Sequence, residues 1–339
     1  MGLRSYEPFL ANGGKIDPLT DIRNMGIVTA GDVYWVSSVS DSDHTARTDK
    51  MGRQVVKTSI QQAVDATVND QNDYILVVPS DANAVFGLGT AVDLNKDRVH
   101  LLGLGYNKAK NSYSVTVRDN FGTTPDTEVI NVTGDGCEIG GLKFLGTLGT
   151  DAGGTRTNGV ARIAGHDFWA HDSVFEDSTA LWGTPSVILG AGTLAHDARF
   201  DDCVFAVTST AVESAANAPL VAGGAGNKRW VFNDSVFKIN AGSVTETFFS
   251  PGTGAKETTT FNRCYFGLVA GTGFAITSAV RGSVTANNPV LLNNCTALSV
   301  TAFGTDTSVF AAPQQAGTAG AGFHNPGIYT VGTGIKVVA

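Results

Sequence analysis

The chain has 339 residues, of which 41 are glycine, 42% are apolar and only 16% are charged. This composition supplies a large core and argues against a disordered chain, and the net charge of −8 argues against a nucleic-acid partner, because phosphate binding requires clustered Lys and Arg. No run of about 18 apolar residues is present, so we also expect no membrane partner.

Residues 1–53 are predicted to form an amino-terminal arm that contains one strand at residues 32–37. The chain begins MGLRSYE, with no basic stretch followed by an apolar one, so we expect no secretory signal. A helix is predicted at residues 58–68, because Ile60, Ala63, Val64 and Val68 recur at the spacing of one helix face. Two apolar runs follow, at residues 73–79 and 98–105.

A repeat of about 30 residues fills much of the remaining chain. Close copies lie at residues 168–175, 198–205, 230–237, 259–266 and 290–297, and a looser copy lies at 139–144. In each copy apolar and polar residues alternate, a two-residue polar break interrupts them, and the alternation resumes. This pattern predicts two short strands that meet at a corner, where Asn and Asp tolerate a left-handed backbone. Equivalent positions are separated by 29–32 residues along the series Leu142, Ser173, Cys203, Ser235, Cys264 and Cys295.

Short strands repeated in this way predict a parallel β-solenoid, in which equivalent residues stack at a strand spacing of about 4.8 Å. The repeat places Cys203, Cys264 and Cys295 in one inward-facing column with serines. We therefore expect these cysteines to be small core residues that need no disulfide. The chain has no CxxC pair, which argues against a zinc finger or a redox motif.

The SIQQAVDA helix, the ILVVPSD and VHLLGLG strands and the repeated F-N-x-C-x-F coils resemble the pectate-lyase-like right-handed parallel β-helix superfamily. The resemblance implies an all-β, single-stranded right-handed parallel β-helix over residues 54–310, with about eight coils. It also implies that the helix caps the open amino-terminal end, where a bare sheet edge would invite aggregation. Residues 311–339 are predicted to form a carboxyl-terminal closing segment.

Enzymes of this fold supply catalytic patterns that can be compared with the sequence. Polygalacturonases carry Asn-Thr-Asp, Asp-Asp, Gly-His-Gly and Arg-Ile-Lys segments, and this chain has only the pair Asp201-Asp202 and a partial match at Gly165-His166-Asp167. Because the acidic pair occupies a corner of the repeat, we expect it to serve the turn rather than catalysis. If the chain is an enzyme, its catalytic candidates are Asp201, Asp202, His196 and His166.

Aligned coils also predict a ladder of polar side chains on one side of the solenoid, with neighbours about 5 Å apart. One interpretation is a patch that binds a divalent metal or a sugar, and the other, which we favour, is a solvated row of charges. No third close metal ligand is supplied, so we expect no resident metal and no cofactor. The ladder consists of His166, Asp167, His196, Asp197, Lys228 and Arg229.

A flat aromatic ring can stack on a sugar, so exposed tryptophans are candidates for glycan contact. The alternation within the repeat directs Trp230 inward and Trp169 outward. Trp169 is therefore the candidate for a polysaccharide partner.

From residue 267 to residue 339 the only Asp, Glu, Lys or Arg residues are Arg281, Asp306 and Lys336, far fewer than a solvated surface carries. Interface cores are depleted of charge, so we expect a homo-oligomer. The resemblance to phage structural proteins described next implies that this oligomer is a trimer. Solenoids with short arms resemble bacteriophage structural proteins. That resemblance implies a non-enzymatic capsid decoration or cement protein, made in the host cytoplasm, located in the virion and bound through its arm to the major capsid protein or another virion protein. The alternative is a tailspike-type protein that binds or depolymerises a polysaccharide, as a glycosidase or lyase.

Overall fold

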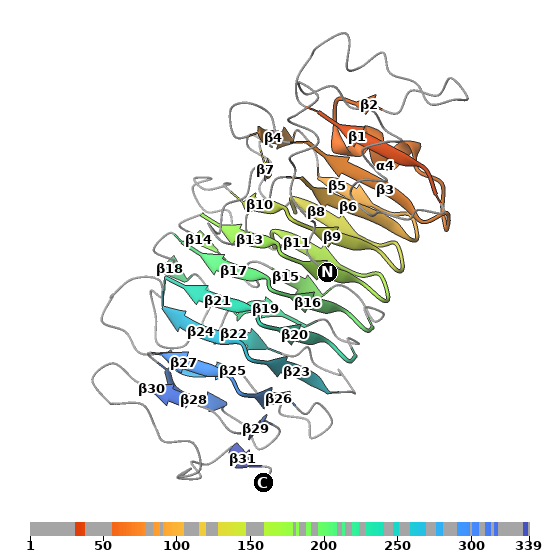
Figure 1. The fold of residues 1–339 in the computed structure, drawn as a ribbon. Helices are drawn as coiled ribbons and strands as arrows, with labels where there is room; N and C mark the ends of the chain where they lie inside the picture. The colour runs from red at the N-terminus through yellow and green to blue at the C-terminus, as the bar shows by residue number, and fades with distance from the viewer. Residues whose placement is uncertain are drawn as a thin grey trace, which may run out of the picture.

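The computed structural model describes residues 31–37, 56–78, 84–88, 91–104, 115–119, 128–146, 159–178, 181–182, 188–190, 196–208, 212–213, 219–223, 228–240, 247–250, 258–268, 276–280, 290–298, 300–304, 309–312, 315–317 and 335–337. These residues form a right-handed parallel β-helix, in which successive coils add strands to three parallel sheets (Figure 1). The predicted all-β solenoid is confirmed, and within the described residues it carries one helix. No helix in this part of the chain is long and apolar enough to cross a membrane.

Sheet 1 is the longest of the three and supplies the outer face that is described below. As far as the chain is described it has 12 strands, and neighbouring strands pair in parallel. In spatial order they are β2 (Val56–Lys57), β1 (Val33–Val36), β3 (Asp73–Val77), β6 (Val99–Gly103), β9 (Glu138–Gly140), β12 (Trp169–His171), β16 (Arg199–Asp201), β20 (Val231–Asn233), β23 (Thr259–Asn262), β26 (Val290–Asn293), β29 (Val309–Ala312) and β31 (Ile335–Val337).

Sheets 2 and 3 complete the coils, and a short pair of strands, β14 (Leu181–Trp182) and β18 (Val212–Glu213), lies apart from them. Sheet 2 consists of β30 (Gln315–Gly317), β27 (Thr296–Leu298), β24 (Tyr265–Leu268), β21 (Val236–Ile239), β17 (Val204–Val207), β13 (Val174–Asp177), β10 (Lys143–Gly146), β7 (Val115–Asp119) and β4 (Ala84–Leu88). Sheet 3 consists of β28 (Val300–Gly304), β25 (Ile276–Val280), β22 (Thr247–Ser250), β19 (Pro219–Ala222), β15 (Ile188–Gly190), β11 (Ala161–Ile163), β8 (Ile130–Val132) and β5 (Val92–Leu94).

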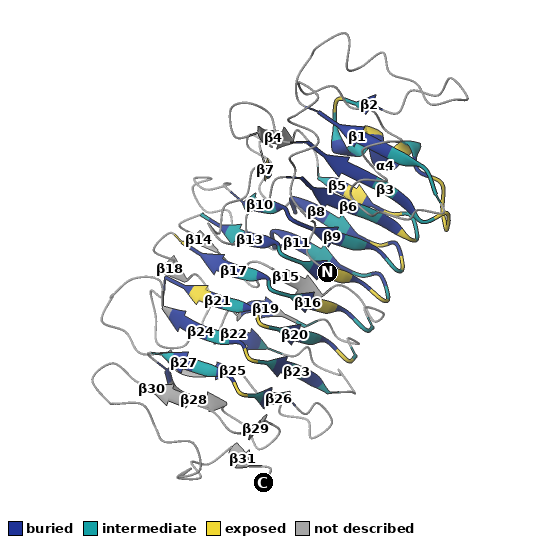
Figure 2. Ribbon diagram, viewed as in Figure 1, coloured by how far each residue is buried: buried dark blue, intermediate teal, exposed yellow. Residues whose placement is uncertain are grey.

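Buried residues recur on the strands from coil to coil (Figure 2). Among them are two columns of aromatic rings in the interior between the sheets. In sheet 1, Phe232 stacks between Phe200 and Phe261, with ring centroids 4.8 and 4.7 Å apart and ring planes within 7° of parallel. In sheet 2, the rings of Phe205 and Phe237 are 4.8 Å apart. The in-register pairing of parallel strands places these rings over one another, so each coil buries its aromatic residues against those of the next.

Two tight corners hold each coil in register with the next one. The leading corner is a pair of residues shortly before a sheet 1 strand, such as His196-Asp197, and the trailing corner is the pair at the end of that strand, such as Asp201-Asp202. The second residue of each has a positive φ, for example 60° at Asp197 and 53° at Asp202. The Asn- and Asp-rich breaks predicted this conformation for the trailing corners, and the leading corners share it. This conformation lets the backbone N–H of Asp202 donate to Asn233 O in the next coil at 2.9 Å. The positive φ recurs at Arg98, Gly136, Asp167, Asp197 and Arg229 in leading corners and at Gly141, Asp172, Asp202, Asp234, Arg263 and Asn294 in trailing corners.

The predicted helix is α4 (Ile60–Ala66), which packs against β1, β2, β3 and β5 near the amino-terminal end of the solenoid (Figure 1). Its N-cap is Ser59, whose Oγ accepts a hydrogen bond from the N–H of Gln62 at 3.2 Å. The helix buries Ile60, Ala63 and Val64, as the spacing predicted.

The prediction for the end of the helix was wrong, because Val68 does not share the apolar face. The backbone is already extended at Thr67, and Val68 is 44% exposed. The chain turns here because Asp73 Oδ2 accepts a hydrogen bond from the N–H of Val68 at 2.8 Å. Thr67 itself is buried, and its hydroxyl donates to Val64 O.

Both ends of sheet 1 extend beyond the stack of about eight coils that the repeat predicted. The strand predicted at residues 32–37 is β1, which pairs with β2 and β3 and so lies within the sheet. At the other end β29 and β31 continue the stack after β26. The boundaries of the arm and of the closing segment stay predictions, because residues 1–30, 38–55 and most of 313–339 lie outside the described residues.

Substitution Phe232→Ala tests the contribution of the aromatic columns. We expect the free energy of unfolding to fall by about 3–5 kcal/mol, because the ring is fully buried between two others and its removal leaves a cavity. Urea denaturation measures the change. The control is Val231→Ala, one residue away on the outward face, for which about 1 kcal/mol or less is expected. Equal losses in the two variants would contradict a core built on the ring column.

Candidate functional site

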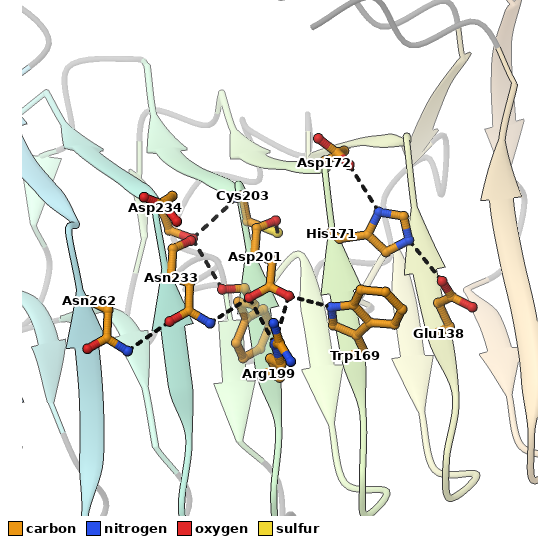
Figure 3. Close-up of polar contacts among 12 residues, drawn as sticks. Glu138, Trp169, His171, Asp172, Arg199, Asp201, Cys203, Asn233, Asp234 and Asn262 are labelled. Atoms are coloured by element: carbon orange, nitrogen blue, oxygen red, sulfur yellow. Dashed lines mark hydrogen bonds and ion pairs between the residues drawn. The ribbon is translucent and has the colours of Figure 1, made fainter. Parts of the chain in front are cut away.

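Sheet 1 presents two outward-facing columns, because the residues on either side of each inward residue face away from the core. Across β6, β9, β12 and β16 these columns hold His100, Glu138, Trp169, His171 and Asp201. Figure 3 shows the last four of these side chains. Acidic, imidazole and aromatic side chains contact one another in this part of the surface. It is therefore the candidate site.

Glu138 lies at the centre of one half of the site and bridges two imidazoles. Its Oε2 is 2.5 Å from His100 Nδ1, and its Oε1 is 2.9 Å from His171 Nε2. The other ring nitrogen of His171 lies 3.1 Å from Asp172 Oδ2, so both nitrogens of that ring face carboxylates. The other nitrogen of His100 lies 2.9 Å from Asn72 Oδ1. These contacts tie β6, β9 and β12 together across the outer face.

The pKa values of this cluster favour the charged forms of Glu138 and His171. Burial alone would raise the pKa of Glu138, but hydrogen bonds from His100 and His171 lower it to about 2. Burial alone would lower the pKa of His171, but its hydrogen bonds to Asp172 and Glu138 raise it to about 9. Near neutral pH the site therefore holds a carboxylate and an imidazolium in contact. Burial and the charge of Glu138 also raise the pKa of Tyr74, whose ring stacks on His100 at 4.3 Å.

Trp169 occupies the other half of the site, and the prediction that it faces outward is confirmed. It is 39% exposed, whereas Trp230, predicted inward, is 1% exposed. Its indole Nε1 donates to Asp201 Oδ2 at 2.9 Å, and the same carboxylate lies 2.7 Å from Arg199 Nε. The ring is flanked by His171, 4.5 Å away between centroids, and by the guanidinium of Arg199 at 6.0 Å. Asp201 thus fixes the orientation of the indole.

Beyond Asp201 the same column becomes a ladder of asparagines. Asn233 Nδ2 donates to Asp201 Oδ1 at 2.6 Å, Asn262 Nδ2 donates to Asn233 Oδ1 at 2.8 Å, and Asn293 Nδ2 donates to Asn262 Oδ1 at 2.9 Å. Each side-chain amide therefore donates a hydrogen bond to the side-chain oxygen at the equivalent position of the preceding coil. A polar face of this kind needs no charge to hold its coils in register.

The four predicted catalytic residues do not converge on one point. His166 and His196 lie in leading corners, and Asp201-Asp202 forms the trailing corner at the other end of β16. Asp201 is engaged with Trp169, Arg199 and Asn233, as described above. The expectation that the acidic pair serves the turn agrees with the positive φ of Asp202, while its catalytic role stays untested.

The predicted ladder of polar side chains is the row of leading corners. The rings of His166 and His196 meet edge to face, with their centroids 4.7 Å apart. The backbones of His196 and Lys228, in neighbouring coils, form a parallel β-bridge. Arg229 makes an ion pair with Asp197, whose pKa it lowers. Burial and the positive charges of Lys228 and Arg229, together with His166, lower the pKa of His196.

The row also extends to earlier coils that the repeat did not reveal. There the first corner residue is Asn69, Asp97 or Asp135, and its side-chain oxygen accepts a hydrogen bond from the backbone N–H of the next corner at 2.7–2.8 Å. The histidines begin where this row of acceptors stops. Among the described residues no group of three or more His, Cys, Asp or Glu side chains is placed to hold a metal ion.

Sequence reasoning did not identify Glu138 and His100 as site residues. Their coils match the repeat only loosely, since glycines occupy both trailing-corner positions after β9. Extending the repeat to residues 99–103 places His100, Glu138 and Trp169 in one outward column, which is the signal that finds them. His171 was identified only as a corner residue.

The Glu138–His171 contact predicts a pH dependence of stability. The pKa of His171 rises from 6.5 to about 9 on folding, so its contribution is complete below pH 6.5 and is lost as the pH rises through about 9. The pKa of Glu138 falls from 4.5 to about 2, so its contribution is complete above pH 4.5 and is lost as the pH falls towards 2. We expect the free energy of unfolding to decrease by about 1–3 kcal/mol between about pH 6 and pH 10.

Urea denaturation across this range measures the effect in the wild type and in the variant His171→Gln. The variant is expected to lose most of the alkaline decrease, because it has no imidazolium in contact with Glu138. The matched control is His166→Gln, which removes an imidazole from outside the cluster and should keep the wild-type slope. A wild-type slope in His171→Gln would show that the cluster does not carry the effect.

The fold is shared with solved structures of low sequence identity. No family model matches the sequence, and no curated protein matches it. A pectin methylesterase from carrot is 15% identical, with 92% of this chain and 90% of that chain covered and a TM-score of 0.60. A pectin methylesterase in complex with a hexasaccharide is 12% identical, with 90% and 92% covered and a TM-score of 0.58. ORF18 of Geobacillus virus E2 overlaps more loosely, at 12% identity, 94% and 65% coverage and a TM-score of 0.43. The chain thus has the pectate-lyase-like right-handed parallel β-helix fold, which by itself names no activity.

Proposed function

We propose that the chain is a non-enzymatic structural protein of a virus particle, specifically a bacteriophage capsid decoration or cement protein. In this proposal it assembles as a homotrimer in the virion and contacts the major capsid protein or another virion protein through its amino-terminal arm. The solenoid serves as a rigid body whose coils are held by stacked rings and paired corners.

The observation that carries the proposal is that the titratable groups of the candidate site are engaged with one another. Glycoside hydrolysis requires a carboxylic acid that keeps its proton near neutral pH, and the pKa of Glu138 is about 2. A lyase requires a base that is free to accept a proton, and the pKa of His171 is about 9, so that ring is already protonated. Asp201 accepts hydrogen bonds from Trp169 and Asn233 and pairs with Arg199. These groups stabilise the outer face rather than provide an acid or a base.

The distribution of charge in the sequence supports assembly. Residues 267–339 contain three charged side chains, and the Asn233–Asn262–Asn293 ladder gives the adjoining face of sheet 1 an uncharged character. Depletion of charge is typical of the central part of protein interfaces. A homotrimer would cover this part of the chain.

The proposal is tested by the mass of the protein in solution and by its presence in particles. Light scattering on the purified chain at micromolar concentration is expected to give the mass of three chains, and a stable soluble monomer would contradict the trimer. Mass spectrometry of purified virions is expected to find the chain at the copy number of a head protein. Its absence from particles, or a tail copy number, would contradict the decoration role.

A second candidate function is polysaccharide binding at Trp169, and its exposure is the observation that favours it. The indole is held by Asp201, and the guanidinium of Arg199 beside it provides hydrogen-bond donors. A neighbour of the same fold has been solved with a hexasaccharide, which is consistent with sugar binding on such a scaffold. Binding of this kind requires no acid or base and so is compatible with a structural protein.

Substitution Trp169→Ala tests this second function. If a polysaccharide from a panel of acidic and neutral polymers binds here, the variant is expected to bind about tenfold more weakly, because the stacking surface is lost. The control is Val231→Ala, which lies two coils further along the same outward column. Calorimetry measures binding, and assays for reducing ends and unsaturated uronates on the same panel are expected to stay blank. Product formation that disappears in Asp201→Asn or His196→Gln would instead establish an enzyme.

A further inference from the structure

The inward column that follows each trailing corner contains an unusual pair of residues. Its members are buried, and all of them after Leu142 are serine or cysteine. Among the described residues of this column, Cys264 and Cys295 are the two cysteines that lie in consecutive coils. From the looser first copy onwards the column reads Leu142, Ser173, Cys203, Ser235, Cys264 and Cys295.

Strand register places Cys264 directly opposite Cys295. Asn262 pairs with Asn293 in sheet 1, and Tyr265 pairs with Thr296 in sheet 2, so the residues between them are also opposed. Parallel neighbours lie about 4.8 Å apart, within the Cα separation of about 4.4–6.8 Å that disulfides span. Both cysteines are free thiols and are 1% exposed.

The two thiols also interact electrostatically. Burial raises the pKa of Cys264, and its interaction with Cys295 raises it further. The same interaction lowers the pKa of Cys295. Cys295 is therefore the sulfur that more readily becomes a thiolate, with Cys264 as the adjacent thiol.

The other cysteines lack such a neighbour and so act as internal controls. Cys203 lies between Ser173 and Ser235 in the same column, because β13, β17 and β21 pair in register. Cys137 lies outside the column, and its thiol donates to Lys96 O at 3.2 Å. Burial raises the pKa of Cys137 to about 12, which disfavours its thiolate.

We propose that Cys264 and Cys295 form an oxidation site that closes to a disulfide between neighbouring coils. With hydrogen peroxide as oxidant, the Cys295 thiolate attacks one peroxide oxygen, the O–O bond breaks, and a sulfenic acid and hydroxide form. The sulfur of Cys264 then attacks the sulfur of Cys295, the S–O bond breaks, and water leaves with the Cys264 proton. In sum, two thiols and one peroxide give one disulfide and two waters.

The disulfide would staple the coil of β23 and β24 to the coil of β26 and β27. A solenoid coil is stabilised chiefly by its nearest neighbours, so its terminal coils open most easily. A covalent link in the carboxyl-terminal half resists that opening. Such cysteines stay reduced in a reducing compartment and form a disulfide in an oxidising one, so the site responds to a change of compartment. This inference does not depend on the proposed virion function.

The experiment compares the full chain before and after treatment with hydrogen peroxide. Each sample is unfolded, alkylated and weighed by mass spectrometry. The reduced chain has 4 cysteines and takes up one label at each, and the oxidised chain is expected to take up two fewer. Peptide mapping is expected to find residues 264 and 295 linked. The thermal unfolding midpoint is expected to rise by about 5 °C or more on oxidation and to return on reduction.

Two serine variants keep the test decisive. Cys264→Ser places in one coil the residue that the same column already holds at Ser173 and Ser235, and the hydroxyl can donate to Asn262 O as the thiol does at 3.5 Å. It is expected to fold, to form no linked peptide and to show no rise in midpoint. Cys203→Ser is expected to behave as the wild type. Oxidised wild type that still labels at every cysteine, or a link that includes Cys203 or Cys137, would overturn the proposal.

Discussion

The structure depends on one constraint, the in-register pairing of parallel strands from coil to coil. Because strands repeat at about 4.8 Å, each side chain has the equivalent side chain of the next coil as its nearest neighbour. Residue types whose side chains attract their own kind therefore stabilise a column. The ring of Phe232, stacked between those of Phe200 and Phe261, is the clearest case. The corners serve the same constraint, because their positive φ directs a backbone N–H to the coil that follows.

On the outer face the constraint turns charge into a problem, since identical charges in one column would repel one another. Several carboxylates of this chain meet an unlike group in a neighbouring coil. Glu138 lies between two imidazoles, Asp197 meets Arg229, and Asp234 meets Arg263. Where no charge is used, amides link in series. Both kinds of contact link neighbouring coils across the outer face.

Much of the fold could be predicted from the sequence, because the repeat encodes it directly. The alternation on either side of a two-residue break identified the inward Phe232 and Trp230, the outward Trp169 and the left-handed corners. The end of α4 was not predictable from spacing, since it depends on a hydrogen bond from the backbone N–H of Val68 to the Asp73 carboxylate. The site was only half predicted. Glu138 and His100 lie in coils whose sequence departs from the repeat, so their meeting follows from register rather than from any local motif.

The trailing corner has the same two-residue length in every copy of the repeat, while the copies are spaced by 29–32 residues. The coils therefore differ in length in the segments outside the repeat copies. The trailing corner, whose length does not change, keeps sheets 1 and 2 aligned. A whole coil could be duplicated or deleted without altering the contacts inside any other coil. The length of such a solenoid therefore changes in steps of one strand spacing, about 4.8 Å, while the remaining coils keep their own core.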